Sequence, residues 1–133
     1  MAYPARLRYS KQHQWIDVSG DIGTIGITDY AQSQLNEIVS VDLPNPGATL
    51  EAGQPLGSVE SVKTVNEIDA PVSGEVLEVN RTLKNAPEKI NADPQGQGWL
   101  IKVRLKNRGE LDVLMDAAAY QAYVAVADKD ISV

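Results

Sequence analysis

Hydrophobic and polar positions alternate in short runs along the first third of the chain. Two such runs, residues 15–18 and 23–27, are separated by a Ser-Gly-Asp sequence at 19–21, which favours a turn. This pattern predicts a β-hairpin. Residues 38–43 are rich in β-branched side chains and predict another strand. That strand should stop at residues 44–47, because the two prolines there cannot donate ladder hydrogen bonds.

A short helix is expected between the hairpin and this strand. Asp29 followed three residues later by Gln32 fits a capping box, which satisfies free backbone N–H groups at the start of a helix. Residues 48–79, by contrast, have no helical period and are interrupted at short intervals by glycine and proline. Short strands with frequent turns are typical of a sandwich or barrel.

The last part of the chain predicts one more strand and two helices. Residues 83–94 are polar and loop-like, with one helical turn at 87–89, where proline suits the first helical position. Residues 99–105 alternate as a half-buried strand does. Residues 110–115 and 116–127 indicate helices, the second capped by Asp116 and rich in alanine.

These elements predict a mainly β protein. We expect residues 1–133 to form a single domain, a flattened β-sandwich with short helices at its edges and C-terminal helices at about 110–127.

Composition and charge exclude several classes of function. The formal net charge is −6 and the basic residues form no stripe, so nucleic-acid binding is not expected. One histidine, no cysteine and no convergent acid pair argue against an enzyme and against a metal site. The N-terminal stretch has no continuous apolar run, so we expect neither a secretory signal nor a membrane span, and we place the protein in the bacterial cytoplasm.

Lys63 is the candidate for chemistry because two β-rich runs meet at it. A hairpin over about residues 57–76 would hold its amine at the tip, where a primary amine can form an amide with an activated acid. Most lysines in surface turns are simply solvated, so the residue type alone does not indicate modification. An interaction module whose Lys63 is never modified therefore stays open.

The surroundings of Lys63 resemble a known attachment site. Glu60, Ser61 and Val62 before the lysine, and the Ala-Pro-Val-Ser-Gly-Glu-Val sequence at 70–76, are similar to the lipoyl-attachment hairpin of the glycine cleavage H-protein family. Biotin carriers, by comparison, typically place methionine on both sides of their lysine, whereas this chain has valine and threonine there. Similar blocks follow in family order at residues 9–15, 26–32, 41–44 and 91–102. The resemblance therefore extends over about residues 7–123.

The resemblance implies a lipoyl carrier of the glycine cleavage system. Lipoate would be attached covalently to Lys63, within a surrounding formed by Glu60, Ser61, Val62 and Thr64 that a lipoate-attaching enzyme recognises. Glycine decarboxylase would load an aminomethyl group, aminomethyltransferase would unload it, and dihydrolipoamide dehydrogenase would reoxidise the dithiol. The protein itself would be non-catalytic and would supply a tethered substrate at high effective concentration.

The family also implies a cleft that docks the loaded arm, at positions matching His13, Gln14 and Glu67. The family usually has glutamate in place of Gln14 and aspartate in place of Glu67, so we expect a more loosely held arm with Glu67 as its charged partner. Gln95 and Ser40 stand where the family generally has tyrosine and phenylalanine. These departures leave open a divergent paralogue that acts in lipoate relay or serves another lipoate-dependent complex.

Overall fold

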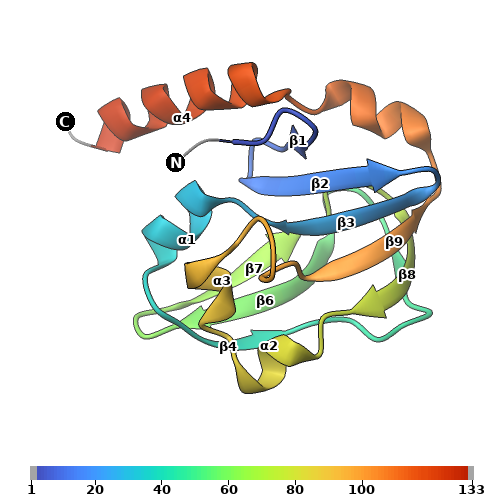
Figure 1. Ribbon diagram of the computed structural model, residues 1–133, viewed down its shortest axis with the longest axis horizontal. Helices are drawn as coiled ribbons and strands as arrows, with labels where there is room; N and C mark the ends of the chain where they lie inside the picture. The colour runs from blue at the N-terminus through green and yellow to red at the C-terminus, as the bar shows by residue number, and fades with distance from the viewer. Residues whose placement is uncertain (1–2, 132–133) are drawn as a thin grey trace.

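Two antiparallel sheets form the body of the protein (Figure 1). The computed structural model describes residues 3–131, and the side chains of residues 3–126. The larger sheet has the strand order β1 (Arg8–Tyr9), β2 (Gln14–Ser19), β3 (Ile22–Ile27), β9 (Ile101–Leu105), β8 (Gly74–Val79), β5 (Thr49–Leu50). The smaller sheet has the order β4 (Ile38–Asp42), β6 (Pro55–Ser61), β7 (Val65–Asp69). The predicted mainly β sandwich is therefore confirmed.

The main hydrophobic core is shared by the two sheets. Ile16 and Ile25 of the larger sheet belong to the same buried cluster as Ile38 and Val59 of the smaller sheet. All four side chains are almost completely buried. Because burial of one such side chain contributes about 1.5–3 kcal/mol, this shared cluster is what holds the sheets together.

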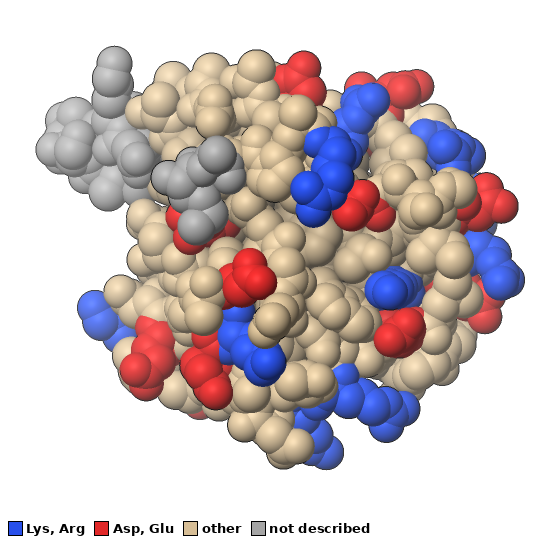
Figure 2. All heavy atoms as spheres, viewed as in Figure 1, with Lys and Arg blue, Asp and Glu red and all other residues tan. Residues whose placement is uncertain are grey.

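The surface carries charges of both signs. Figure 2 shows Lys and Arg beside Asp and Glu over the viewed face. Two of the ion pairs, Lys102 with Glu78 at 3.9 Å and Arg104 with Glu75 at 3.8 Å, join β8 to β9. Such exposed pairs contribute about 0–1 kcal/mol each, so core packing rather than surface charge sets the fold.

Helices cover the edges of the sandwich, as the sequence predicts, but two lie where a loop is expected. The helices are α1 (Asp29–Leu35), α2 (Thr82–Asn85), α3 (Lys89–Ala92), the 3₁₀ helix η1 (Arg108–Val113) and α4 (Ala117–Ile131). The helical turn predicted at residues 87–89 is found, but it continues as α3 to Ala92, and α2 is not predicted. Leu83 in α2 and Ile90 in α3 are fully buried in the main core, and each anchors a one-turn helix that its polar neighbours do not predict.

Helix α1 begins one residue earlier than the capping box indicates. Thr28 is the N-cap, and its Oγ1 accepts a hydrogen bond from the Ala31 backbone N–H at 3.2 Å. Asp29 lies in the first turn instead, where its carboxylate accepts from the Gln32 side-chain amide at 2.9 Å. The side chain predicted as the cap is thus part of the helix proper.

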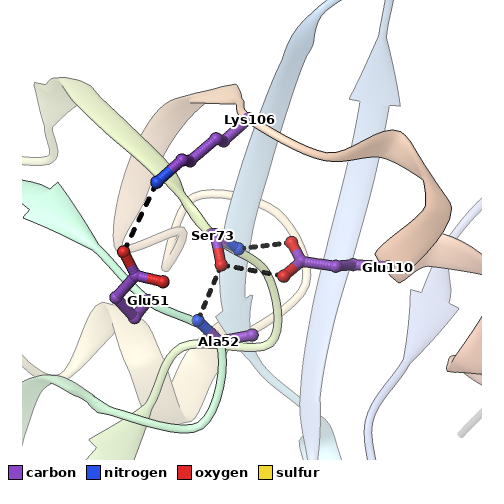
Figure 3. A network of polar contacts seen from close by, with 5 residues as sticks. All are labelled: Glu51, Ala52, Ser73, Lys106 and Glu110. Carbon is purple, nitrogen blue, oxygen red and sulfur yellow. Dashed lines mark hydrogen bonds and ion pairs between the residues drawn. The ribbon is translucent and has the colours of Figure 1, made fainter.

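The C-terminal segment begins with a 3₁₀ helix rather than with an α-helix at residue 110. Glu110 in η1 accepts hydrogen bonds from the backbone N–H and the Oγ of Ser73, at 2.7 and 2.8 Å (Figure 3). Ser73 Oγ in turn accepts from the Ala52 backbone N–H at 2.9 Å. These contacts tie η1 to the loop that precedes β8, and this tertiary anchor is absent from the local sequence pattern.

Helix α4 lies beside β1 at the edge of the larger sheet (Figure 1). There it covers a second, aromatic cluster of side chains. Leu7, Tyr9, Trp15 and Tyr120 form its buried centre. The predicted cap is confirmed, since Asp116 accepts from the Ala119 backbone N–H at 2.8 Å. The helix continues to residue 131, past its predicted end at 127. Within residues 3–131, no helix has both the length and the apolar character that crossing a membrane requires.

Candidate functional site

Lys63 lies exposed in the turn between β6 and β7. The backbone N–H of Ser61 donates to the Thr64 carbonyl at 2.8 Å, which closes the turn. Beneath it, Ser61 Oγ accepts from the backbone N–H of Lys63 at 3.3 Å and of Thr64 at 3.2 Å. The Ser61 side chain is 4% exposed. A buried hydroxyl therefore shapes the backbone that presents the lysine.

The rest of the hairpin is tied to the smaller sheet and to the segment after α1. The Val62 backbone N–H donates to the Glu37 carbonyl at 3.1 Å. A Cβ at Gly57 would lie 2.2 Å from the Asp42 carbonyl oxygen of β4, so the close approach of β6 to β4 requires glycine. The turn is thereby held at a fixed place relative to the sandwich.

The tip of the hairpin is apolar around the lysine. Val62 is 60% exposed and Val65 is 63% exposed, whereas Glu60, which pairs with Val65 across the hairpin, is an exposed carboxylate. None of the ion pairs formed by the described residues includes Lys63. An exposed amine on a rigid turn fits a covalently attached arm, because a modifying enzyme can reach it and the product can move freely.

A cleft of about 200 Å³ lies between the loop before β2, helix α1 and strand β7. His13 and Glu67, two of the predicted docking residues, both line it. The remaining lining residues are Gln12, Ile27, Tyr30, Ala31, Gln34, Leu35 and Asn66. The cleft therefore combines apolar and aromatic side chains with three side-chain amides, one carboxylate and one imidazole.

Gln14, the third predicted docking residue, is absent from the lining of this cleft. Its side chain is 4% exposed. The Oε1 atom accepts from Ser10 Oγ at 2.5 Å, and the Nε2 group donates to the Gln12 carbonyl at 3.2 Å. Gln14 thus supports the loop that carries His13.

His13 is held from behind by residues that the sequence did not single out. Its Nδ1 lies 2.8 Å from the hydroxyl of Tyr120 on α4, and this hydroxyl lies 2.7 Å from Thr28 Oγ1. Burial lowers the pKa of His13, because a partly buried ring loses the solvation of its charged form. Burial also raises the pKa of the Tyr120 hydroxyl, so both groups are neutral at pH 7.

Gln95 and Ser40, which stand where the family generally has aromatic residues, have different surroundings. Gln95 Oε1 accepts from the Asp29 backbone N–H at 3.0 Å and so helps to hold the start of α1. Ser40 is exposed on β4 and pairs with Glu60 on β6. Across the described residues, His, Cys, Asp and Glu side chains form no group of three that could hold a metal ion.

Comparisons with known proteins test the resemblance of this chain to a known family. The model of the family described as "Glycine cleavage H-protein" matches residues 7–127. A Bacteroides fragilis protein named "Glycine cleavage system H protein" is 49% identical over 124 residues, which cover 93% of this chain and 98% of that protein. A protein of the same name from Symbiobacterium thermophilum is 53% identical over 120 residues, covering 90% and 94%.

A solved structure gives the same result. The crystal structure of a glycine cleavage system H protein from Mycobacterium marinum superposes with a TM-score of 0.85 at 36% sequence identity, covering 92% of this chain and 99% of the other. The family model and both relatives cover nearly the whole chain. The resemblance predicted from the sequence is confirmed, and the chain belongs to the glycine cleavage H-protein family.

Proposed function

We propose that this protein serves the glycine cleavage system as a lipoyl carrier whose arm is attached to Lys63. The observation that carries the proposal is the exposed lysine at the tip of a hairpin whose turn is organised by the buried Ser61. In the attachment step the Lys63 amine attacks the activated carboxyl carbon of lipoate. An amide bond forms, and the activating group leaves while the amine loses a proton.

The chain contributes tethering and presentation rather than catalysis. When attached, lipoate supplies the disulfide and dithiol chemistry that a chain without cysteine lacks. Tethering keeps the reacting group at high effective concentration beside each partner. The proposed partners are glycine decarboxylase, aminomethyltransferase and dihydrolipoamide dehydrogenase. Bacterial relatives support the bacterial cytoplasm as the compartment.

The hairpin tip also supports recognition by the lipoate-attaching enzyme. Val62 and Val65, on either side of the lysine, leave most of their apolar surface in contact with water. A transient contact with a partner would bury this surface and is therefore favoured. Glu60 and Thr64 add a carboxylate and a hydroxyl beside this apolar contact. The attaching enzyme would therefore read a small mixed surface centred on the amine.

The cleft supports docking of the arm. Glu67 lies four residues after Lys63, and extended backbone spans at most about 13 Å over that distance. A carboxylate in a partly apolar cleft stabilises a cationic group on the arm, which otherwise would lose its solvation on entering. We propose that Glu67 and His13 contact the arm, and that Gln14 acts indirectly by holding the His13 loop.

Intact mass spectrometry tests the attachment site. Wild-type protein is incubated with a lipoate-attaching enzyme, ATP and lipoate, beside the variants Lys63→Arg and Lys84→Arg. Lys84 is an exposed lysine on α2 and serves as the matched control. The wild type and Lys84→Arg should each gain one lipoyl group, and Lys63→Arg should gain none. Addition of the group to Lys63→Arg would contradict the assignment.

The docking proposal is tested by the rate at which the loaded arm hydrolyses. Glu67→Gln should hydrolyse faster than wild type, because the docked cation loses its counter-charge. Glu60→Gln removes a carboxylate from the same hairpin outside the cleft lining and should have no effect. Because Gln14 does not line the cleft, Gln14→Glu should not slow hydrolysis, and a slower rate would instead support direct docking at this position. Equal rates for Glu67→Gln and wild type would exclude Glu67 as the charged partner.

A further inference from the structure

A chain of hydrogen bonds runs from the start of α1, through α4, to the wall of the cleft. Thr28 Oγ1 accepts from the Ala31 backbone N–H at 3.2 Å and lies 2.7 Å from the Tyr120 hydroxyl. The Tyr120 hydroxyl lies 2.8 Å from His13 Nδ1. Thr28 and Tyr120 are both 0% exposed, so water does not compete for these bonds.

The positions of the hydrogens follow from the partners available. Thr28 Oγ1 already accepts from a backbone N–H, and among the described residues the Tyr120 oxygen is the acceptor within reach of its own proton. If Thr28 donates to Tyr120, the Tyr120 proton is directed to His13 Nδ1. The neutral ring then carries its proton on Nε2. This direction of donation leaves each hydroxyl of the chain satisfied.

We propose that Tyr120 is a positioning residue of the arm-docking cleft, which orients His13 and fixes its Nε2–H form so that the ring offers one hydrogen-bond donor to the arm. The proposal rests on the function proposed above for the cleft. The Nε2 atom of His13 has no hydrogen-bond partner among the described residues, whereas Nδ1 is hydrogen-bonded to the Tyr120 hydroxyl. The matching acceptor on the arm is a neutral oxygen, such as the carbonyl of the lipoyl-lysine amide.

The hydroxyl of Tyr120 can be separated from the packing of its ring. The ring stacks on Tyr9 with centroids 4.7 Å apart and an interplanar angle of 11°, and phenylalanine would preserve this contact. Tyr120→Phe therefore removes the bond to His13 and leaves α4 in place. The nearby Tyr123 offers a matched control, because its hydroxyl donates to the Lys11 carbonyl at 3.0 Å rather than to His13.

The groups that face His13 come from three elements. Tyr30 of α1 approaches with ring centroids 4.7 Å apart, and Tyr120 and Tyr123 of α4 approach at 5.8 and 5.7 Å. Glu67 of β7 lines the same cleft. The Glu67 carboxylate favours the charged form of the His13 ring, whereas burial disfavours it. Burial has the larger effect and lowers the pKa of His13, so the ring is neutral near pH 7.

Nitrogen NMR of the unmodified protein tests the proposal directly, because His13 is the only histidine in the chain. At pH 8 the wild type should show an Nε2-protonated ring with an Nδ1 that accepts a hydrogen bond. Tyr120→Phe should show a mixture of the two neutral forms, and Tyr123→Phe should match the wild type. A wild-type ring protonated on Nδ1, or a Tyr120→Phe spectrum unchanged from wild type, would overturn the proposal.

A second pair of variants, both at Thr28, tests the direction in which the hydroxyl groups donate. Thr28→Ser keeps the hydroxyl that donates to Tyr120, whereas Thr28→Val removes it at nearly the same volume. Both variants should keep the wild-type ring form, because the Tyr120 hydroxyl keeps its own proton for His13 Nδ1 when the Thr28 donor is lost. A changed ring form in Thr28→Val alone would show that Tyr120 donates to Thr28 and would contradict the direction of donation.

The consequence for the arm is measured on lipoylated protein. Hydrolysis of the loaded arm in Tyr120→Phe should be about two- to tenfold faster than in wild type, the range that one net hydrogen bond allows. An unchanged rate would overturn the role of His13 as a donor to the arm. Absence of lipoyl attachment to Lys63 would instead refute the function proposed above, while the ring form in the unmodified protein stands independently.

Discussion

At the scale of single residues, buried hydroxyl groups shape the two parts of the site. Ser61 lies beneath the turn that presents Lys63, and Tyr120 lies behind His13. Neither side chain is exposed to a partner. Each forms hydrogen bonds with a neighbouring residue. The effect of replacing Ser61 should therefore be measured at Lys63 and Thr64, and that of replacing Tyr120 at His13.

Replacement of Ser61 by alanine tests the first of these roles. Ser61→Ala removes the acceptor for the Lys63 and Thr64 backbone N–H groups and should lower the free energy of unfolding by about 1 kcal/mol. The Thr64 amide should exchange with solvent faster, and lipoylation should slow because the turn is less ordered. Ser58→Ala on the same strand is the control and should change neither rate. Wild-type exchange at Thr64 in Ser61→Ala would rule out this role.

Alkaline titration tests the burial of Tyr9. Burial raises the pKa of Tyr9 from 10.0 to about 12, and its hydroxyl donates to the Pro4 carbonyl at 2.8 Å. A folded pKa above the unfolded one means that this contribution to stability is complete below pH 10 and is lost as pH rises toward 12. The free energy of unfolding should therefore fall by up to about 1.4 kcal/mol per pH unit per such tyrosine. In Tyr9→Phe the slope from urea titrations should be smaller, and an equal slope would contradict this explanation.

At the scale of elements, the local sequence pattern predicts those helices and strands whose formation depends on residues close together in the sequence. Most strands follow from alternation, glycine and proline and are found where expected, but the short strand β1 is not predicted. The hairpin at Lys63 is shorter than the predicted 57–76, because it ends at Asp69 and residues 74–79 form β8 of the larger sheet. Helix α2 and the extension of α3 to Ala92 are missed because each depends on one buried side chain in a polar stretch, Leu83 and Ile90. The 3₁₀ form of η1 depends on the contact of Glu110 with Ser73, which is 37 residues away in sequence.

The same reason limits prediction of the site. Lys63 and its neighbours are predicted from one continuous motif, and His13 and Glu67 from their match to family positions. Tyr120 escapes notice because its partner His13 is 107 residues away, and a tyrosine in an alanine-rich helix gives no local signal. Only the folded structure shows that Tyr120 is fully buried beside His13, which is the observation that supports its proposed positioning role.

Replacement of Glu110 tests the anchor of η1. Glu110→Ala removes the carboxylate that accepts two hydrogen bonds from Ser73 and should lower the free energy of unfolding by about 2–3 kcal/mol. Asp112→Ala in the same 3₁₀ helix removes an exposed carboxylate and should change stability by less than about 0.5 kcal/mol. Equal effects in urea unfolding would show that the network in Figure 3 contributes nothing specific.

At the scale of the whole molecule, we propose that the chain unfolds as one domain. The main core includes residues from both sheets, and the aromatic cluster under α4 is joined to the larger sheet through Trp15. The indole Nε1 of Trp15 donates to the Pro94 carbonyl at 2.9 Å and so links that cluster to the segment after α3. No element has a core of its own within the described residues.

Coincident unfolding curves test this proposal. Both tryptophans, Trp15 and Trp99, belong to or pack against the aromatic cluster, so their fluorescence follows the α4 side of the molecule. Far-ultraviolet circular dichroism follows the whole backbone. The two signals should change together with urea in a single transition. Separate midpoints would show that α4 and its cluster unfold independently of the sandwich.

The central claim concerns one amine, that of Lys63, and glycine turnover measures it most directly. Purified glycine decarboxylase, aminomethyltransferase and dihydrolipoamide dehydrogenase are combined with lipoylation-treated wild type, Lys63→Arg or Lys84→Arg. Wild type and Lys84→Arg should support glycine-dependent NADH formation at equal rates, whereas Lys63→Arg should not exceed the rate without carrier. Turnover by Lys63→Arg at the wild-type rate would contradict the account.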